Sequence, residues 1–221
     1  MEQVSERHAS ATPASAAATI YPATKRFLDI IGSATLLLLL SPVMAAIAAS
    51  IALETGLPII YKCERLGRFG TPMTAYKFRT MRDGSHHHLE ELLLNDEEFR
   101  LEYEQSRKLR EDPRRTRVGI VLRRSSLDEL PQLWNVLRGQ MSLIGPRPYF
   151  LHELEGTEYE AAILSVRPGI TGLWQVSGRS DLPLERRMEL DAEYVQRRGP
   201  RLDLWILAHT LGAVVSGRGA Y

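Results

Sequence analysis

Two adjacent acidic residues, Asp128 and Glu129, lie in the segment SSLDELPQLWNVL, where the sequence predicts the start of a helix. Ser126 and Glu129 are three residues apart, which is the spacing of a capping box at a helix N-terminus. Acidic residues stabilise helix N-termini through the helix dipole, and this role alone would explain the pair. The chemical alternative is that Asp128 is a carboxylate nucleophile. A carboxylate is ionised at pH 7, and free N–H groups at a helix N-terminus bind phosphate.

A set of basic residues can neutralise the phosphate charge that would otherwise repel such a nucleophile. All of them lie in short segments flanked by turns: Lys77 and Arg79 in YKFRTM, Arg123 and Arg124 just before the acidic pair, Arg147 in GPRP, and Arg179 in SGRS. A solvated basic face would explain any one of them. Their recurrence beside Gly and Pro favours phosphate binding, because the planar guanidinium group grips phosphate with two hydrogen bonds.

The acidic pair also favours a divalent metal ion. Mg²⁺ usually takes one or two carboxylates together with phosphate oxygens of a substrate. We therefore expect Mg²⁺ as the cofactor, with Glu129 as a ligand. The sequence has neither a Walker motif nor the glycine pattern of a dinucleotide site. Its single cysteine, Cys63, excludes an internal disulfide and a multi-cysteine metal cluster.

An apolar segment precedes these motifs, from residue 30 to residue 53. As a straight helix it would be about 36 Å long, enough to cross a hydrocarbon core of about 30 Å. Ser41 and Pro42 interrupt it at the midpoint. Basic residues flank both ends, whereas a spanning helix is basic mainly on its cytoplasmic side. This pattern favours a re-entrant helix–break–helix hairpin with both ends in the cytoplasm. A conventional span and a cleaved signal peptide are the alternatives.

The remaining sequence predicts an α+β protein, mostly helical and with short strands. The 221 residues are 44% hydrophobic and 25% charged with a formal net charge of +1, which argues against a nucleic-acid partner. We expect a disordered tail at 1–20, a membrane helix with its flank at 21–57, and a cytoplasmic domain at 58–221. Within that domain the patterns predict strands at 59–61 and 73–78, and helices at 89–110, from 126 onward, near 153–164, at 183–197 and at 202–215.

Four segments of the sequence resemble the bacterial sugar transferase family, the monotopic polyprenyl-phosphate phosphoglycosyl transferases. They are KRFLDIIGS, KFRTM, DPRRTRVGIVLRRSSLDELPQLWNVLRGQMSLIGPRP and RPGITGLWQVSGRS. The resemblance extends from about Lys25 to the end of the chain and is strongest to the exopolysaccharide-production branch. It implies that Asp128 attacks the sugar-linked phosphate of a UDP-sugar, releases UMP, and holds a phosphosugar until undecaprenyl phosphate attacks it.

The same resemblance implies roles for further residues. Glu129 would help to hold Mg²⁺, and the hairpin would break at Ser41-Pro42. Substrate-binding positions of the family match Lys77, Arg123, Arg147, Arg179 and Asp191, to which the basic pattern above adds Arg79.

The resemblance also implies a place for the protein in the cell. The catalytic domain would lie on the cytoplasmic face of the bacterial inner membrane, with the apolar helix at 202–215 along the lipid interface as an interfacial amphipathic helix. A catalytically silent membrane adaptor with the same fold is the alternative function. The sequence leaves open a homo-oligomer, the identity of the sugar, and the role of the insert at 82–111.

Overall fold

The computed structural model describes residues 16–82, 84–106, 109 and 111–216. Helix predominates among them, and the strands are short, as the sequence predicts. In chain order the elements are α1 (Ala16–Thr55), β1 (Ile60–Leu66), η1 (Arg68–Gly70), β2 (Pro72–Phe78), α2 (Ser85–Asn95), α3 (Glu97–Ser106), α4 (Arg117–Ser125), η2 (Leu127–Glu129), α5 (Gln132–Leu137), β3 (Ser142–Ile144), α6 (Leu151–Leu154), α7 (Glu160–Leu164), β4 (Gly169–Thr171), α8 (Leu173–Ser177), η3 (Arg179–Asp181), α9 (Leu184–Arg197) and α10 (Pro200–Ser216).

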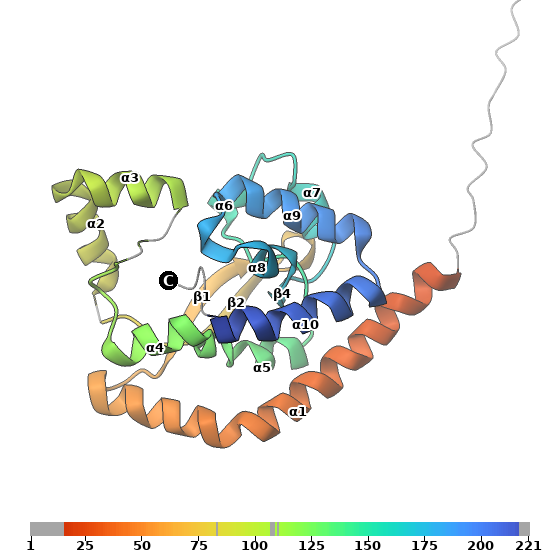
Figure 1. Ribbon diagram of the computed structural model, residues 1–221, viewed down its shortest axis with the longest axis horizontal. Helices are drawn as coiled ribbons and strands as arrows, with labels where there is room; N and C mark the ends of the chain where they lie inside the picture. The colour runs from red at the N-terminus through yellow and green to blue at the C-terminus, as the bar shows by residue number, and fades with distance from the viewer. Residues whose placement is uncertain (1–15, 83, 107–108, 110, 217–221) are drawn as a thin grey trace, which may run out of the picture.

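α1 is one continuous helix of 40 residues, so the expected break at Ser41-Pro42 is not an interruption of the helix. Pro42 has no N–H to donate to the carbonyl of Leu38, four residues back. The Ser41 hydroxyl donates to that carbonyl instead, at 2.8 Å. The chain therefore stays helical, and α1 bends near its middle (Figure 1). The helix already includes residues 16–20 of the expected tail, and residues 1–15 lie outside the described part of the chain.

The N-terminal arm of α1 is fixed to α5 and β3. Nη1 of Arg26 donates to the carbonyl of Val136 at 2.7 Å, and Nη2 donates to that of Leu137 at 3.0 Å. These carbonyls end α5, where a positive charge is favourable. The buried carboxylate of Asp29 accepts the N–H of Leu143 at 2.9 Å. This arm therefore lies against the globular part of the protein.

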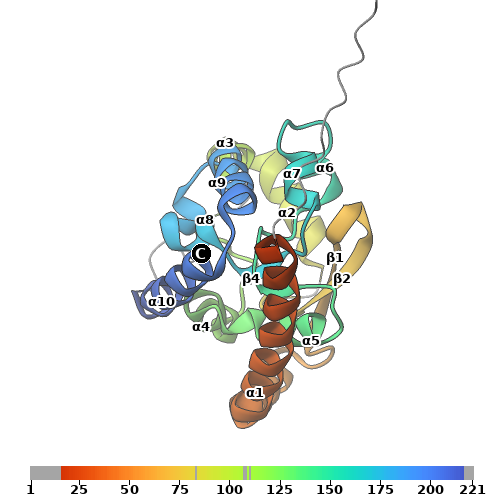
Figure 2. The ribbon, with the colours of Figure 1, turned by 90° about the vertical axis from the view of Figure 1, so that its right-hand side faces the viewer.

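The C-terminal arm of α1 returns to the same globular part. The Glu54 carboxylate accepts the N–H groups of Arg117 at 2.7 Å and Val118 at 2.9 Å, in the first turn of α4. Ile47 and Ile51 are buried in an apolar cluster that includes β2 and α4 residues. The bend points away from the other elements (Figure 1), and in the end view α1 runs from the middle of the molecule to its lower edge (Figure 2).

Two small sheets carry the loops of the globular part. β1 and β2 pair antiparallel, with Ile60 opposite Phe78. β3 and β4 pair in parallel, and a Cβ atom added to Gly169 would lie 2.1 Å from the nitrogen of Gly145. Only glycine allows so close an approach, which brings the GPRP and RPG loops together. α8, α9 and α10 enclose an apolar cluster with β3, formed by Ile144, Leu173, Trp174, Leu190, Tyr194 and Ile206.

Two predicted helices are each divided in the structure. The expected helix at 89–110 is the pair α2 and α3, because Oδ1 of Asp96 accepts the N–H of Glu98 at 3.0 Å and starts a new helix. The expected helix at 153–164 is α6 and α7, separated at Gly156, where φ is +76°. α2 and α3 pack on each other and stand at one end of the molecule (Figure 1).

Candidate active site

The turn between α4 and α5 carries the two acidic residues. Ser126 ends α4 in the left-handed conformation, with φ at 57°, and its side chain makes no capping hydrogen bond to η2. The predicted capping box is therefore wrong. The left-handed conformation of Ser126, which ends α4, is not that of an N-cap. Asp128 and Glu129 consequently lie in a 3-10 turn and not in the first turn of a long helix.

Apolar contacts fix this turn beside the membrane helix. Leu127 and Leu130, which flank the acidic pair, pack on the same buried cluster as Met44 and Ala48 of α1. The position of the pair is therefore determined by the C-terminal arm of α1.

Asp128 lies near the partly buried side chain of Arg123. Asp128 is 9% exposed, and Arg123, in the last turn of α4, interacts with it electrostatically. Nε of Arg123 donates to the Thr80 hydroxyl at 3.0 Å. Burial lowers the pKa of Arg123, whereas the carboxylates of Asp128 and Asp112 raise it. Because an arginine stays protonated despite such a shift, Arg123 partly compensates the charge of the Asp128 carboxylate.

Glu129 lies between two further cations. Nζ of Lys77, on β2, is 2.5 Å from Oε1 of Glu129. Arg179, in η3, has a strained φ of 54°, and its Nη2 lies 3.4 Å from the Ser126 hydroxyl. Burial lowers the pKa of Arg179, and the Glu129 carboxylate opposes that shift. Among the described residues, the buried Nη1 of Arg179 has no hydrogen-bond partner, so it can donate to an anion.

Arg79 has a different environment from the other basic residues of the pattern. Its Nη2 donates to the carbonyl of Thr55 at 2.9 Å, to the Thr55 hydroxyl at 2.6 Å and to the carbonyl of Gly56 at 2.6 Å. The Arg79 side chain thus caps the C-terminus of α1. Its role in substrate binding stays a prediction, and its described contacts are those of a helix cap.

Arg147 and Asp191 form a second polar region. The carboxylate of Glu153 accepts hydrogen bonds from Nη1 and Nη2 of Arg147, each at 3.2 Å. Oδ2 of Asp191 accepts the backbone N–H of Arg147 at 2.9 Å and the Tyr149 hydroxyl at 2.8 Å. Asp191 is fully buried, and burial raises the pKa of its carboxyl to about 7. Asp191 therefore fixes the GPRP loop, and its contact with a substrate stays a prediction.

The structure thus gathers Lys77, Arg123 and Arg179 around the acidic pair, and places Arg147 with Asp191. It also reveals Glu153, which the sequence patterns did not single out. Its position six residues after Arg147, near the start of a short helix, gives no signal of the ion pair. The sequence patterns did not single out Arg65 either. The planar group of Arg65 lies 3.2 Å from the centre of the Phe150 ring, and that contact depends on tertiary folding.

The acidic pair provides only part of a metal site. Among the described residues there is no group of three or more His, Cys, Asp or Glu side chains that could hold a metal ion. Two adjacent carboxylates nevertheless suit Mg²⁺, which keeps several water ligands and takes others from substrate phosphates. Asp128 and Glu129 are therefore compatible with a magnesium ion that binds together with a phosphorylated substrate.

These features place a cluster of charged side chains beside one long apolar helix. Residues 21–55 are long and apolar enough to cross a membrane, and only 11% of their most apolar window is buried inside the protein, which a soluble core helix would not allow. The chain belongs to the bacterial sugar transferase family, whose sequence profile matches residues 20–217. The resemblance inferred from the motifs is confirmed.

Individual relatives are similar over most of this chain. It is 44% identical over 200 residues to the UDP-galactose-lipid carrier transferase of Erwinia amylovora, a match that covers 89% of this chain and 41% of the relative. It is 44% identical over 201 residues to the undecaprenyl-phosphate galactose phosphotransferase of Salmonella typhimurium. This match covers 89% of this chain and 41% of the relative. The exopolysaccharide production protein ExoY of Rhizobium meliloti is 42% identical over 198 residues. This match covers 89% of this chain and 88% of the relative. The chain therefore spans well under half of the first two relatives and most of the third.

Proposed function

We propose that this protein transfers a hexose 1-phosphate from a UDP-sugar to undecaprenyl phosphate and thereby initiates the assembly of an exopolysaccharide repeat unit. The names of the relatives support this class of reaction, since they include an undecaprenyl-phosphate galactose phosphotransferase and an exopolysaccharide production protein. The observation that carries the proposal is the convergence of Lys77, Arg123 and Arg179 on the turn of Asp128 and Glu129. These cations come from three separate elements, β2, α4 and η3.

The proposed mechanism has two displacements at one phosphorus atom. The Asp128 carboxylate attacks the sugar-linked phosphate, the bond from this phosphorus to the bridging oxygen breaks, and UMP leaves with the electron pair. An aspartyl phosphosugar remains. An oxygen of undecaprenyl phosphate then attacks the same phosphorus, the bond to Asp128 breaks, and the carboxylate is regenerated. The first displacement needs no general base, because the carboxylate is ionised at pH 7.

The basic residues would neutralise the charge of the diphosphate. Arg123 faces Asp128, and Arg179 has a buried Nη1 that can donate to a phosphate oxygen. Guanidinium groups placed where negative charge develops stabilise phosphoryl transfer. Glu129, oriented by Lys77, would hold Mg²⁺ together with Asp128. The ion would supply positive charge to the phosphates of the donor.

The contacts of α1 support the re-entrant topology. Arg26 in its N-terminal arm and Glu54 at its C-terminal end both bind elements of one globular part. A helix that crossed the bilayer would put these two ends on opposite sides, and one small domain cannot contact both of them there. The bend instead lets α1 dip into one leaflet. We place the domain on the cytoplasmic face, where the UDP-sugar is available.

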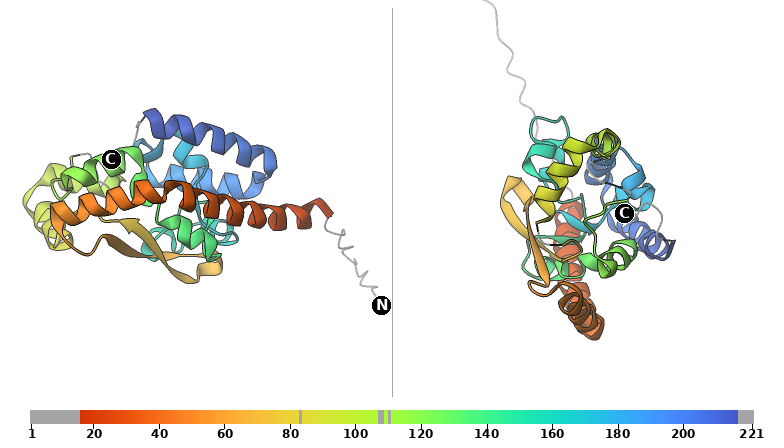
Figure 3. Two further views of the ribbon diagram at one scale, coloured as in Figure 1. Left: turned by 90° about the horizontal axis from the view of Figure 1, so that it is seen from below. Right: turned by 90° about the vertical axis from the view of Figure 1, so that its left-hand side faces the viewer.

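α10 would lie along the interface in this arrangement. Its outer face exposes Leu204, Trp205 and Leu211, at 67%, 44% and 72%. Trp at such a position favours the boundary between headgroups and hydrocarbon. Seen from below, α1 crosses the middle of the view and α10 lies along its upper edge (Figure 3, left). The acidic pair would then be held near headgroup height, within reach of a lipid phosphate.

The experiment is an assay for UMP release by the purified protein in lipid nanodiscs. UDP-hexoses and UDP-N-acetylhexosamines are each tested with Mg²⁺ and undecaprenyl phosphate. We expect UMP and a lipid-linked sugar diphosphate from at least one donor, and loss of both when EDTA removes the metal. If no donor releases UMP although the protein is folded, the silent membrane adaptor replaces the transferase.

A further inference from the structure

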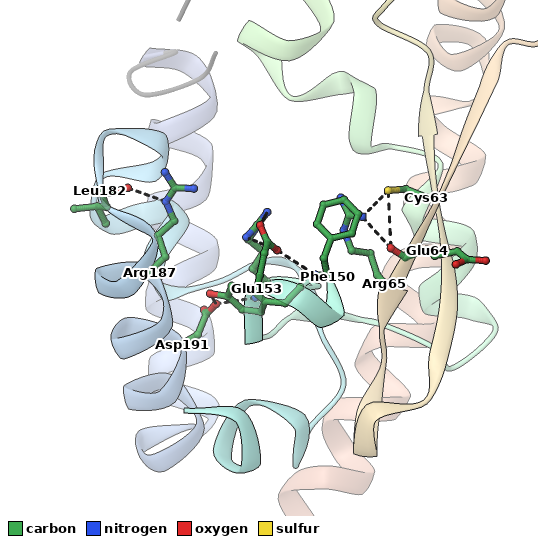
Figure 4. A network of polar contacts seen from close by, with 10 residues as sticks. Cys63, Glu64, Arg65, Phe150, Glu153, Leu182, Arg187 and Asp191 are labelled. Carbon is green, nitrogen blue, oxygen red and sulfur yellow. Dashed lines mark hydrogen bonds and ion pairs between the residues drawn. The ribbon is translucent and has the colours of Figure 1, made fainter. Parts of the chain in front are cut away.

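The GPRP loop, α6 and α9 share a polar network, in which Glu153 and Asp191 lie on the two helices (Figure 4). Its centre is the fork of Arg147, whose two terminal nitrogens each donate to a different oxygen of Glu153 at 3.2 Å. The side chains are 15% and 3% exposed, so the ion pair is largely shielded from water. Such a two-point pair fixes the plane of a guanidinium group as well as its position.

Glu153 is itself held in place. Its Oε2 accepts the N–H of Phe150 at 3.0 Å, at the start of α6. Burial favours the neutral acid, but Arg147, the Phe150 amide and Arg65 outweigh it and hold the pKa of Glu153 below its ordinary value. Glu153 is therefore a carboxylate at neutral pH. A fixed carboxylate can orient the arginine that faces it.

The backbone of Arg147 is fixed from the other side. Oδ2 of Asp191, on α9, accepts its N–H at 2.9 Å. Acidic residues of two helices thus determine both the backbone and the side chain of one loop arginine. A guanidinium group has five N–H donors, and the pair with Glu153 uses one on each terminal nitrogen. Three donors of Arg147 are left by this pair: Nε–H and one N–H of Nη2 lie along one side edge of the group, and one N–H of Nη1 lies on the other side.

We propose that Glu153 is a positioning residue: it holds Arg147 so that the side edge of the guanidinium group, formed by Nε and Nη2, meets a phosphate of the sugar nucleotide. This inference rests on the proposed function, in which Arg147 binds the donor. A long side chain that is already held in its binding orientation loses less conformational freedom when the ligand arrives. Glu153 would therefore act on donor affinity through Arg147, without touching the donor.

The first test is the variant Glu153→Gln. Glutamine keeps an oxygen that can accept the Phe150 N–H but removes the charge that holds the arginine. We expect KM for the UDP-sugar to rise about 10-fold, with kcat changed less than about twofold, because a binding interaction is lost and the nucleophile is intact. Equal KM values for the variant and the wild type would overturn the inference.

The second test is a double-mutant cycle. Arg147→Ala lowers kcat/KM, and adding Glu153→Gln to Arg147→Ala should lower it no further, because the only route of action is already gone. If Glu153 has a merely structural role, Glu153→Gln lowers kcat/KM by the same factor in both backgrounds. That outcome overturns the inference.

Glu160→Gln is the matched control. Glu160 also accepts a backbone N–H, from Gly156 at 2.9 Å, and no described ion pair joins it to an arginine. Its KM should equal that of the wild type. If Glu153→Gln fails to fold, Glu153→Asp keeps the charge but shortens the reach to Arg147 by one methylene. A raised KM in this variant supports the inference, and an unchanged KM contradicts it.

A binding measurement separates this inference from the proposed function. UDP is titrated by calorimetry into Asp128→Asn, with and without Glu153→Gln, and we expect about 10-fold weaker binding in the double variant. If the wild type releases no UMP from any donor, the proposed function fails. If the wild type is active and Glu153→Gln binds UDP as tightly as its parent, only the positioning role fails.

Discussion

Asp128 and its neighbours show how charge and burial can be balanced at a single residue. A carboxylate that is 9% exposed would be costly without a compensating cation, and Arg123 supplies one. Lys77 binds Glu129, so the two carboxylates have separate partners. The chain therefore keeps two adjacent carboxyl groups in a short turn beside an apolar helix.

The first prediction concerns Asp128→Asn. The amide has nearly the same shape but is not a nucleophile, so UMP release should fall by about 10³-fold or more. The thermal midpoint should stay within a few degrees of the wild type. Incubation with a radiolabelled UDP-sugar should label the wild-type protein and leave the variant unlabelled. Turnover by the variant at the wild-type rate would show that another residue attacks phosphorus.

The second prediction concerns the buried acid Asp191. Because burial raises its pKa to about 7, the folded protein holds a proton between about pH 4 and pH 7 that the unfolded chain releases. Its contribution to stability is therefore complete below about pH 4 and is lost as the pH rises through 7. Arg147 and Tyr149 face the same carboxyl group.

The measurement for Asp191 is the thermal midpoint as a function of pH. The wild type should lose stability between about pH 4 and pH 7 more steeply than Asp191→Asn, which has no carboxyl group to ionise. Parallel curves for the two proteins would mean that Asp191 is ionised throughout this range in the folded state.

At the scale of the elements, the structure shows which features the sequence could predict. Periodicity predicted α9 and α10, and the apolar run predicted α1. The strands β3 and β4 have three residues each, too few for a pattern, and they exist only because two glycine-containing loops meet. The capping box at Ser126 failed because local spacing cannot reveal that Ser126 takes the left-handed conformation that ends α4.

The candidate site likewise contains residues that the sequence could predict and residues that it could not. The residue types and turn-flanked positions predicted Lys77, Arg123 and Arg179 near the acidic pair. They could not distinguish Arg79, which caps α1, because a capping arginine and a phosphate-binding arginine look alike in sequence. Nor could they pair Arg147 with Asp191, which lies 44 residues further along the chain.

The third prediction tests the role of Arg79. Arg79→Leu removes the three contacts to the end of α1, so stability should fall by about 2 kcal/mol, the scale of hydrogen bonds to a charged group. KM for the donor should stay near the wild-type value if capping is its whole role. Thermal melting and steady-state kinetics measure the two effects.

A surface arginine provides the control for Arg79. Arg100→Gln breaks only the exposed pair with Glu97, which should cost less than about 0.5 kcal/mol. If Arg79→Leu raises KM strongly and melts like the wild type, Arg79 belongs to the substrate site as the sequence pattern suggests.

At the scale of the whole molecule, one buried carboxylate connects the membrane helix to the C-terminal helices. Asp203 of α10 accepts hydrogen bonds from the Tyr21 hydroxyl and from Nζ of Lys25, each at 2.8 Å, and from the Tyr194 hydroxyl at 2.9 Å. These partners lie on α1 and α9. Together with Arg26 and Glu54, this contact makes α1 part of the folded domain and not a tethered anchor.

The last prediction follows from that integration. Both ends of α1 should lie on the cytoplasmic side, because each is bonded to one domain on one side of the bilayer.

Cysteines are introduced at Leu57, which is 74% exposed beyond the helix, and at Leu38, which is 76% exposed near the bend. The native Cys63 is buried and should contribute little background. A membrane-impermeant maleimide should label Leu57→Cys only in opened cells and Leu38→Cys in neither preparation, because the proposed topology places the bend in lipid. An N-terminal tag should likewise be digested by protease only after the cells are opened. Digestion of that tag in intact cells would mean that α1 spans the membrane, and the contacts of Arg26 with α5 could not then exist in the bilayer.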